Sequence, residues 1–174
     1  MDLAILERIN HLLVELRNLF RKGKEMSIAD YLDDRQVVFL NVTSQEEAIN
    51  DLIEALDSSH KLKEKEAFKQ AILQREKLVS TGIGLGVAVP HAKLQGYDDF
   101  FIAIGIQSGR GIEWNAIDGL PAHLIFMIGG PDNRQTEYLK ILSRLTAAIK
   151  DPERRANLLK ATSASQVIAL FQGC

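Results

Sequence analysis

The chain has few of the residues that characterise disulfide-linked, zinc-binding or membrane proteins. Cys174, the last of its 174 residues, is its only cysteine, so an intrachain disulfide and a thiolate zinc cluster are both excluded. No apolar run approaches the ~20 residues of a membrane-spanning helix. Charged residues also interrupt the apolar positions near the N-terminus, which argues against a signal peptide. These absences predict a cytoplasmic protein with no membrane insertion.

An excess of charge of one sign is also missing. The chain has 21 Lys and Arg against 23 Asp and Glu, a formal net charge of −2. Such a balance provides no general basic field, so we expect no nucleic-acid partner. The 46% of apolar residues and 25% of charged residues are typical of a soluble globular protein. The length suits one domain with a short appendage.

The appendage is predicted at residues 1–26, which have the periodicity of an amphipathic helix. Gly23 lies near its end, and apolar residues recur every three or four positions at Leu6, Ile9, Leu13, Leu16 and Phe20. This stripe of about three heptads is long enough for a short coiled coil. Packing on its own domain, self-association as a homodimer and binding of a partner all remain open.

Residues 27–174 are predicted to form one domain in which strands alternate with helices. Strands are expected at 36–42, 99–107 and 120–130, and helices at 43–60, 63–78, 134–149, 152–160 and 163–171. Thr43 or Ser44 before Glu47 makes a capping-box start for the first of these helices. The SGRG turn at 108–111 predicts an antiparallel hairpin. The order indicates an α/β (α+β mixed) fold, a small mixed β-sheet sandwiched between helices on both faces.

The most informative stretch is TGIGLGVAVPHAK at residues 81–93. Its glycines have GxGxG spacing, and the β-branched VAV and Pro90 that follow are incompatible with the helix that a dinucleotide loop requires. The GK[ST] ending of a nucleotide P-loop is missing as well. We therefore predict a close-packed strand, in which the glycines allow close approach of backbone or ligand. This strand presents His91 at the end of the sheet.

His91 has either a chemical role or only a local carbonyl partner. Arg75 upstream and Lys93 downstream could neutralise a phosphoryl group, and Lys93 shares a face with His91 if the chain stays extended. Neutral imidazole is a nucleophile near pH 7 because its pKa is about 6.5. Small donors that we expect to bind the phosphoryl oxygens are Ser80, Thr81 and the backbone of Gly84. The other histidines, at positions 11, 60 and 123, are interpreted as structural, and no metal site is expected.

The run REKLVSTGIGLGVAVPHAK, from Arg75 to Lys93, resembles the active-site segment of phosphotransferase-system (PTS) IIA domains of the fructose/mannitol type. The STGIG run and the lysine after the histidine are most similar to the nitrogen-regulatory branch. The resemblance continues through IDGLPAHLIFMIGGPDNRQTEYLKILSRLTAAI. It implies that His91 accepts a phosphoryl group from an HPr-type phosphocarrier protein, that Arg75 stabilises its charge, and that no cofactor is needed.

Two residues depart from the pattern of this family. Tyr138 stands where many members have a second histidine, and a phenol cannot replace an imidazole base. Ala92 stands where glycine is frequent. The resemblance favours a regulatory phosphoryl carrier. The alternatives are a IIA component that passes phosphate to a sugar-specific IIB domain, a regulatory module that binds a target without taking phosphate, and a hydrolase with His91 as base, which no motif supports.

Overall fold

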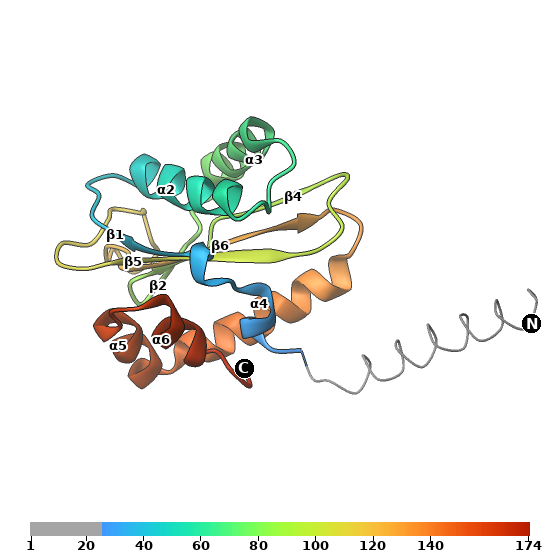
Figure 1. The fold of residues 1–174 in the computed structure, drawn as a ribbon. Helices are drawn as coiled ribbons and strands as arrows, with labels where there is room; N and C mark the ends of the chain where they lie inside the picture. Colours follow the sequence, from blue (N-terminus) through green and yellow to red (C-terminus); the bar gives the residue numbers. More distant parts are fainter. Residues whose placement is uncertain (1–25) are drawn as a thin grey trace, which may run out of the picture.

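The computed structural model describes residues 26–174 (Figure 1). The amphipathic helix predicted for residues 1–26 lies outside the described residues except for Met26, and so does its predicted self-association. The boundary between residues 26 and 27 stays a prediction.

The described elements follow the predicted order. Two 3-10 turns, η1 (Ile28–Tyr31) and η2 (Asp34–Gln36), precede the sheet. The helices are α2 (Gln45–Ser58), α3 (Lys65–Leu78), α4 (Gln135–Lys150), α5 (Pro152–Lys160) and α6 (Ala164–Ala169). The strands are β1 (Val37–Leu40), β2 (Gly82–Gly84), β3 (Val87–Ala88), β4 (His91–Leu94), β5 (Phe101–Gln107) and β6 (Leu124–Pro131).

Hydroxyl caps determine where several of these elements begin. The Ser44 hydroxyl accepts a hydrogen bond from the Glu47 amide, and the Glu47 carboxylate accepts one from the Ser44 amide. This reciprocal arrangement satisfies two amides that the first turn of α2 leaves without helical partners. Ser27 caps η1 in the same reciprocal way with Asp30, whereas at the start of α6 only the Ser163 hydroxyl accepts a hydrogen bond, from the Gln166 amide. The capping-box start predicted from sequence is therefore confirmed at Ser44.

The sheet is mixed, with strand order β1-β5-β6-β3-β2. β5 and β6 are antiparallel, whereas β1 runs parallel to β5. β3 and β4 lie end to end along the other side of β6, both parallel to it, at Leu124–Ile125 and at 128–131. The predicted antiparallel pair is confirmed. The prediction of a tight SGRG turn is wrong, because β5 and β6 are joined by the long segment 108–123. This segment is braced by a bridge between Ile112 and Ala122.

Helices cover both faces of the sheet, with α2 and α3 on one face and α4, α5 and α6 on the other (Figure 1). Alternate residues of β5 point to opposite layers, as a pleated strand requires. Ile102 and Ile104 pack toward α4, whereas Phe101 and Ala103 pack toward α2 and α3. Every residue of β5 and β6 is buried, so these strands read as continuous apolar runs. The predicted fold class is confirmed.

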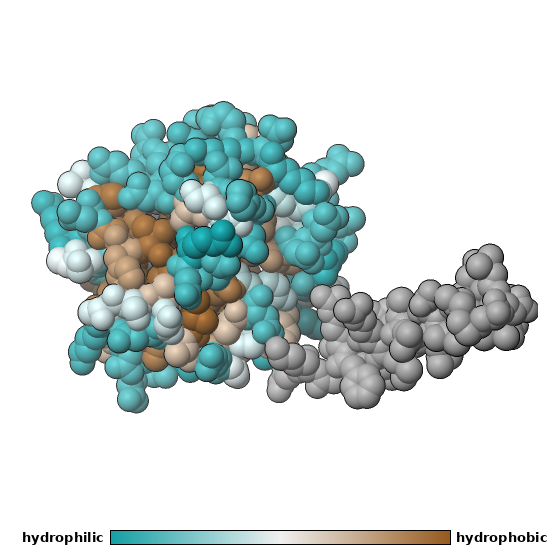
Figure 2. All heavy atoms as spheres, in the orientation of Figure 1, coloured by the Kyte–Doolittle hydropathy of each residue, from teal (hydrophilic) through white to brown (hydrophobic). Residues whose placement is uncertain are grey.

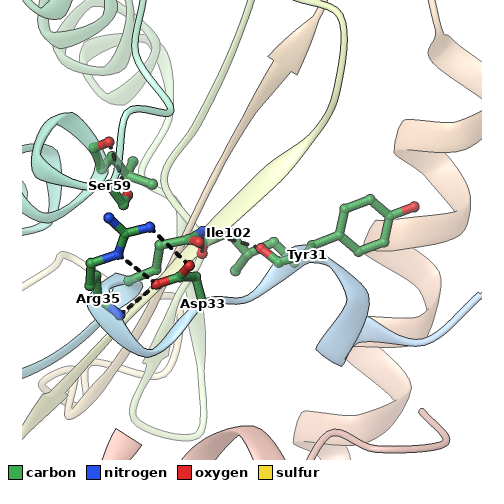
Figure 3. A network of polar contacts seen from close by, with 7 residues as sticks. Tyr31, Asp33, Arg35, Ser59 and Ile102 are labelled. Atoms are coloured by element: carbon green, nitrogen blue, oxygen red, sulfur yellow. Dashed lines mark hydrogen bonds and ion pairs between the residues drawn. The ribbon is translucent and has the colours of Figure 1, made fainter.

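The segment before β1 is tied to the centre of the sheet (Figure 3). Asp33 accepts hydrogen bonds from the backbone amide of Arg35 at 2.9 Å and from its guanidinium at 3.0 Å. The side-chain amide of the buried Gln36 donates to the carbonyl oxygens of Ile102 and Tyr31 at 2.7 and 3.2 Å. These bonds hold the start of the domain against β5.

The two edges of the sheet differ in character. Figure 2 shows apolar side chains gathered between α2 above and α5 and α6 below, over the edge strand β1. Phe39 of that strand is 45% exposed. The opposite side of β6 is occupied by β4, which carries His91 and Lys93.

Candidate phosphoryl-transfer site

The site begins at the C-terminal end of α3. Arg75 lies in the last turn of this helix, and its Nη1 donates to the Val79 carbonyl oxygen at 3.0 Å. Cationic side chains at this end of a helix satisfy carbonyls that lack helical partners and suit the negative end of the helix dipole. The same guanidinium extends to the sheet, where its Nε donates to Nε2 of His91 at 3.2 Å.

The glycine-rich stretch between α3 and His91 is a hairpin, which corrects the predicted single strand. β2 and β3 pair in antiparallel fashion, and Gly84, Leu85 and Gly86 form the turn with φ values of +88°, +59° and +74°. Positive φ costs glycine little, which explains two of the three glycines. Gly82 has the predicted role of close approach, because a Cβ there would lie 3.0 Å from Ala116.

Pro90 separates β3 from β4, and His91 opens β4 instead of following the last strand residue. His91 pairs with Ile128, so it lies within a strand that flanks β6. The prediction that His91 lies at the end of the sheet is therefore wrong. Ala92 packs toward α2 and α3. His91 and Lys93 therefore project to the face of α4, which confirms their predicted common side.

The hydrogen bonds of the imidazole define its tautomer. Nδ1 lies 2.9 Å from the Val89 carbonyl oxygen, which can only accept, whereas Nε2 faces the Nε–H of Arg75, which can only donate. A neutral ring satisfies both partners when Nδ1 carries the proton and Nε2 keeps its lone pair. The nitrogen that keeps its lone pair is therefore Nε2.

Burial lowers the pKa of His91 below its ordinary value of 6.5, because the half-buried ring is poorly solvated when charged. The positive charges of Arg75 and Lys93 lower this pKa further, while the bond to Val89 and the carboxylate of Glu76 act in the opposite direction. The ring is neutral at physiological pH as a result.

Tyr138, in the first turns of α4, supplies the opposite wall of the site. Its ring centroid lies 5.8 Å from that of His91. The Lys93 ammonium sits 4.5 Å from the centroid of the same ring and also donates to Oε1 of Gln135. A cation over an aromatic face is attracted by the ring quadrupole. Burial raises the pKa of Tyr138 above 10.0, so the phenol stays neutral.

The structure does not bring the remaining predicted residues to the imidazole by any hydrogen bond that we observe. The Ser80 hydroxyl donates to the Trp114 carbonyl oxygen. The Thr81 hydroxyl is buried and bonded to Glu76 and Trp114. Gly84 lies in the hairpin turn against Asp118. All three belong to the loop that supports His91.

Sequence reasoning missed Glu76, Trp114 and Gln135. Glu76 is next to Arg75, but its partner Thr81 is apparent only once the chain turns after α3. Trp114 and Gln135 come from distant segments and carry no motif. Residues 26–174 contain no group of three or more His, Cys, Asp and Glu side chains placed to hold a metal ion. None of their helices is long and apolar enough to cross a membrane.

Comparison with known proteins agrees with this geometry. The profile of the family described as "Phosphoenolpyruvate-dependent sugar phosphotransferase system, EIIA 2" matches residues 30–174. A fructose-specific EIIABC component of Bacillus subtilis is 39% identical over 84% of the chain, although the chain spans only 23% of that relative's length. A nitrogen regulatory protein of Bradyrhizobium diazoefficiens is 32% identical over 74% of the chain and 82% of its own length.

Solved structures show the same architecture. The nitrogen regulatory protein IIA-Ntr of Neisseria meningitidis has a TM-score of 0.76 and 29% identity, covering 82% of this chain and 97% of its own. The mannitol IIA of Escherichia coli has a TM-score of 0.67 and 26% identity, covering 80% and 97% of the two chains. With a family profile that covers most of its length, this chain belongs to the EIIA type-2 family of the phosphoenolpyruvate-dependent phosphotransferase system, whose domains are phosphoryl carriers.

Proposed function

We propose that the chain accepts a phosphoryl group on Nε2 of His91 from an HPr-type phosphocarrier protein in the cytoplasm. The observation that carries this proposal is the different bonding of the two imidazole nitrogens. Nδ1–H is held by the Val89 carbonyl, and the lone pair of Nε2 faces a guanidinium. Phosphoryl transfer demands mainly an aligned nucleophile and neutralised oxygens.

In this reaction the Nε2 lone pair forms the new N–P bond. The electron pair of the broken P–N bond returns to the donor's histidine nitrogen. The proton on Nδ1 of His91 stays in place, so positive charge develops on the ring as the bond forms. The Val89 carbonyl, 2.9 Å from Nδ1, stabilises that charge.

Arg75 must give up its bond to Nε2 before phosphorus can approach. Its guanidinium has five N–H donors, and it stays anchored to the Val79 carbonyl through Nη1. A small rotation moves Nε from the ring nitrogen to a phosphoryl oxygen. Lys93, held over Tyr138, supplies the second positive charge. Gly84 and the hydroxyls of Ser80 and Thr81 then contribute as supports of this loop.

Exposed apolar side chains beside the site favour a protein as phosphoryl donor. Leu78, at the end of α3, is 78% exposed, and Leu139, next to Tyr138, is 52% exposed. Apolar side chains near a reactive group are typical of a docking surface for another protein.

We further propose a regulatory output, in which the phosphorylation state of His91 controls binding to a target protein. The relatives named nitrogen regulatory protein and the likeness to IIA-Ntr support this choice. The second candidate is transfer of the phosphoryl group to a IIB domain. A fructose-specific EIIA component of Haloferax volcanii, 33% identical over 71% of the chain and 80% of its own length, favours that candidate.

The test is incubation of the protein with a phosphorylated carrier protein. We expect acid-labile, base-stable label on the wild type and on His123→Gln, and none on His91→Gln. Label on His91→Gln would overturn the assignment. A wild type that takes no label but still binds a partner would support a non-phosphorylated binding module instead.

Self-association through residues 1–26 stays a separate proposal, and deletion of residues 1–24 should then lower the mass measured by light scattering.

A further inference from the structure

A closed circuit of hydrogen bonds lies behind His91. Nδ1 of His91 donates to the Val89 carbonyl, and the Val89 amide donates to the Thr81 carbonyl at 3.0 Å. The Thr81 amide and hydroxyl both donate to the Glu76 carboxylate, at 2.9 and 2.6 Å. Glu76 is the chain neighbour of Arg75, whose Nε donates to His91 and closes the circuit.

We propose that Glu76 is a positioning residue for phosphoryl transfer, which acts through Thr81 on the orientation of His91 relative to Arg75. This inference rests on the proposed phosphorylation of His91 and adds a residue to it. Glu76 need not touch the phosphoryl group. Its carboxylate joins the end of α3 to the loop that leads into β4, and so determines the distance between guanidinium and imidazole.

The far side of the circuit is anchored in the core. Trp114 is fully buried, and its indole Nε1–H donates to the Thr81 hydroxyl at 3.1 Å. Because an indole nitrogen can only donate, the Thr81 oxygen accepts from Trp114 and directs its own hydrogen to Glu76. A buried donor without a partner costs free energy. Trp114 therefore confines the Thr81 hydroxyl to one orientation, the one that Glu76 requires.

The negative charge of Glu76 has a second consequence at the imidazole. The charged and titratable groups that face His91 are Arg75 and Glu76 from α3, Lys93 from β4 and Tyr138 from α4. Glu76 is the one anion among these groups, and it raises the pKa of His91 against the two cations.

The experiment compares Glu76→Gln and Thr81→Val with one matched control, Glu66→Gln on the exposed first turn of α3. Thr81→Ser, which keeps the hydroxyl, tests whether the conservative variant restores the rate. We expect phosphoryl transfer from the carrier to slow about tenfold in Glu76→Gln and in Thr81→Val, the size of effect expected for a hydrogen bond to a charged group. Glu66→Gln should label at the wild-type rate, and Thr81→Ser should be slowed less than Thr81→Val.

A purely structural role would lower the melting temperature alone, so two NMR readouts on the unphosphorylated protein are added. Glu76→Gln should lower the pKa of His91, because it removes an anion, and should shift the ring nitrogen signals away from a single Nδ1–H tautomer. If Thr81→Val does not fold, Thr81→Ala, which removes the hydroxyl without adding volume, takes its place.

Wild-type rates and unchanged ring signals in Glu76→Gln would overturn the inference. Failure of the wild type to take label would overturn the proposed function instead. In that case the tautomer and pKa of His91 in the unmodified protein still decide whether Glu76 orients the ring.

Discussion

His91 and His123 have the same local support but different surroundings. Both rings are half-buried, and both place Nδ1 next to a backbone carbonyl oxygen, that of Val89 at 2.9 Å and that of Gln107 at 3.1 Å. Nε2 of His91 meets the Arg75 guanidinium. Nε2 of His123 lies against Gly111, where an added Cβ would be only 2.7 Å away. A carbonyl next to Nδ1 is common to both, so the guanidinium at the other nitrogen is what distinguishes His91.

The largest expected effect comes from removing that cation. Arg75→Gln should slow labelling of His91 by about a hundredfold, comparable to the loss of one donor that stabilises developing charge. Arg110→Gln, which removes a guanidinium from the loop near His123, should leave the rate unchanged. Quench-flow labelling with a phosphorylated carrier measures both rates. Equal rates for wild type and Arg75→Gln would show that the guanidinium only holds the end of α3.

A stability effect of intermediate size is expected at the other histidine. The Cβ of Gly111→Ala would lie 2.7 Å from Nε2 of His123 and 2.8 Å from Pro121. Overpacking of this kind costs about 1–3 kcal/mol, measured as the free energy of unfolding in urea. Labelling of His91 should not change. The double variant with His123→Ala should recover part of the loss, and a double variant as unstable as Gly111→Ala would place the strain elsewhere.

A smaller effect is expected at Tyr138. Tyr138→Leu removes the ring under the Lys93 ammonium and should slow labelling by about twofold to fivefold, the value of a partly exposed cation–π contact. Tyr138→Phe keeps the ring and should label at the wild-type rate. If Tyr138→Phe is as slow as Tyr138→Leu, the phenol and not the ring face is the functional part.

The smallest expected effect is the contribution of His91 to the pH dependence of stability. Its pKa is lowered in the folded protein, mainly by burial, so below about 6.5 the unfolded chain binds more protons than the folded one. The free energy of unfolding should therefore fall as the pH drops from 6.5 through the folded pKa. His91→Gln should flatten this slope. An identical slope in His91→Gln would assign the dependence to other groups.

Much of the fold could be predicted because its signals are local. The capping box at Ser44, the β-branched strands and the alternation of helices with strands all depend on residues a few positions apart. The hairpin at Gly84 and the long connection after Gln107 were not predicted. Single glycines permit both a strand and a turn, and only pairing with β6 decides between them.

The residues of the site also divide into those with a local sequence signal and those whose role depends on distant partners. His91 was predicted from PH after a β-type run, and Arg75 and Lys93 from the family resemblance and from charge. Glu76 and Trp114 were not predicted, because their roles depend on Thr81, which contacts both only when the chain is folded. Lys93 was expected to bind phosphate, but its support from Tyr138 and Gln135 joins segments far apart in sequence.

The sequence by itself determined the order of elements and the capped start of α2, and it pointed to His91 as the candidate nucleophile, because caps, periodicity and the chemistry of imidazole are properties of neighbouring residues. The tertiary structure alone decided which ring nitrogen is free and in which direction the pKa of His91 moves. Both depend on burial at the edge of β6 and on the charges of Arg75 and Glu76 from α3 and of Lys93 from β4. Only folding creates that low-dielectric, charge-lined edge.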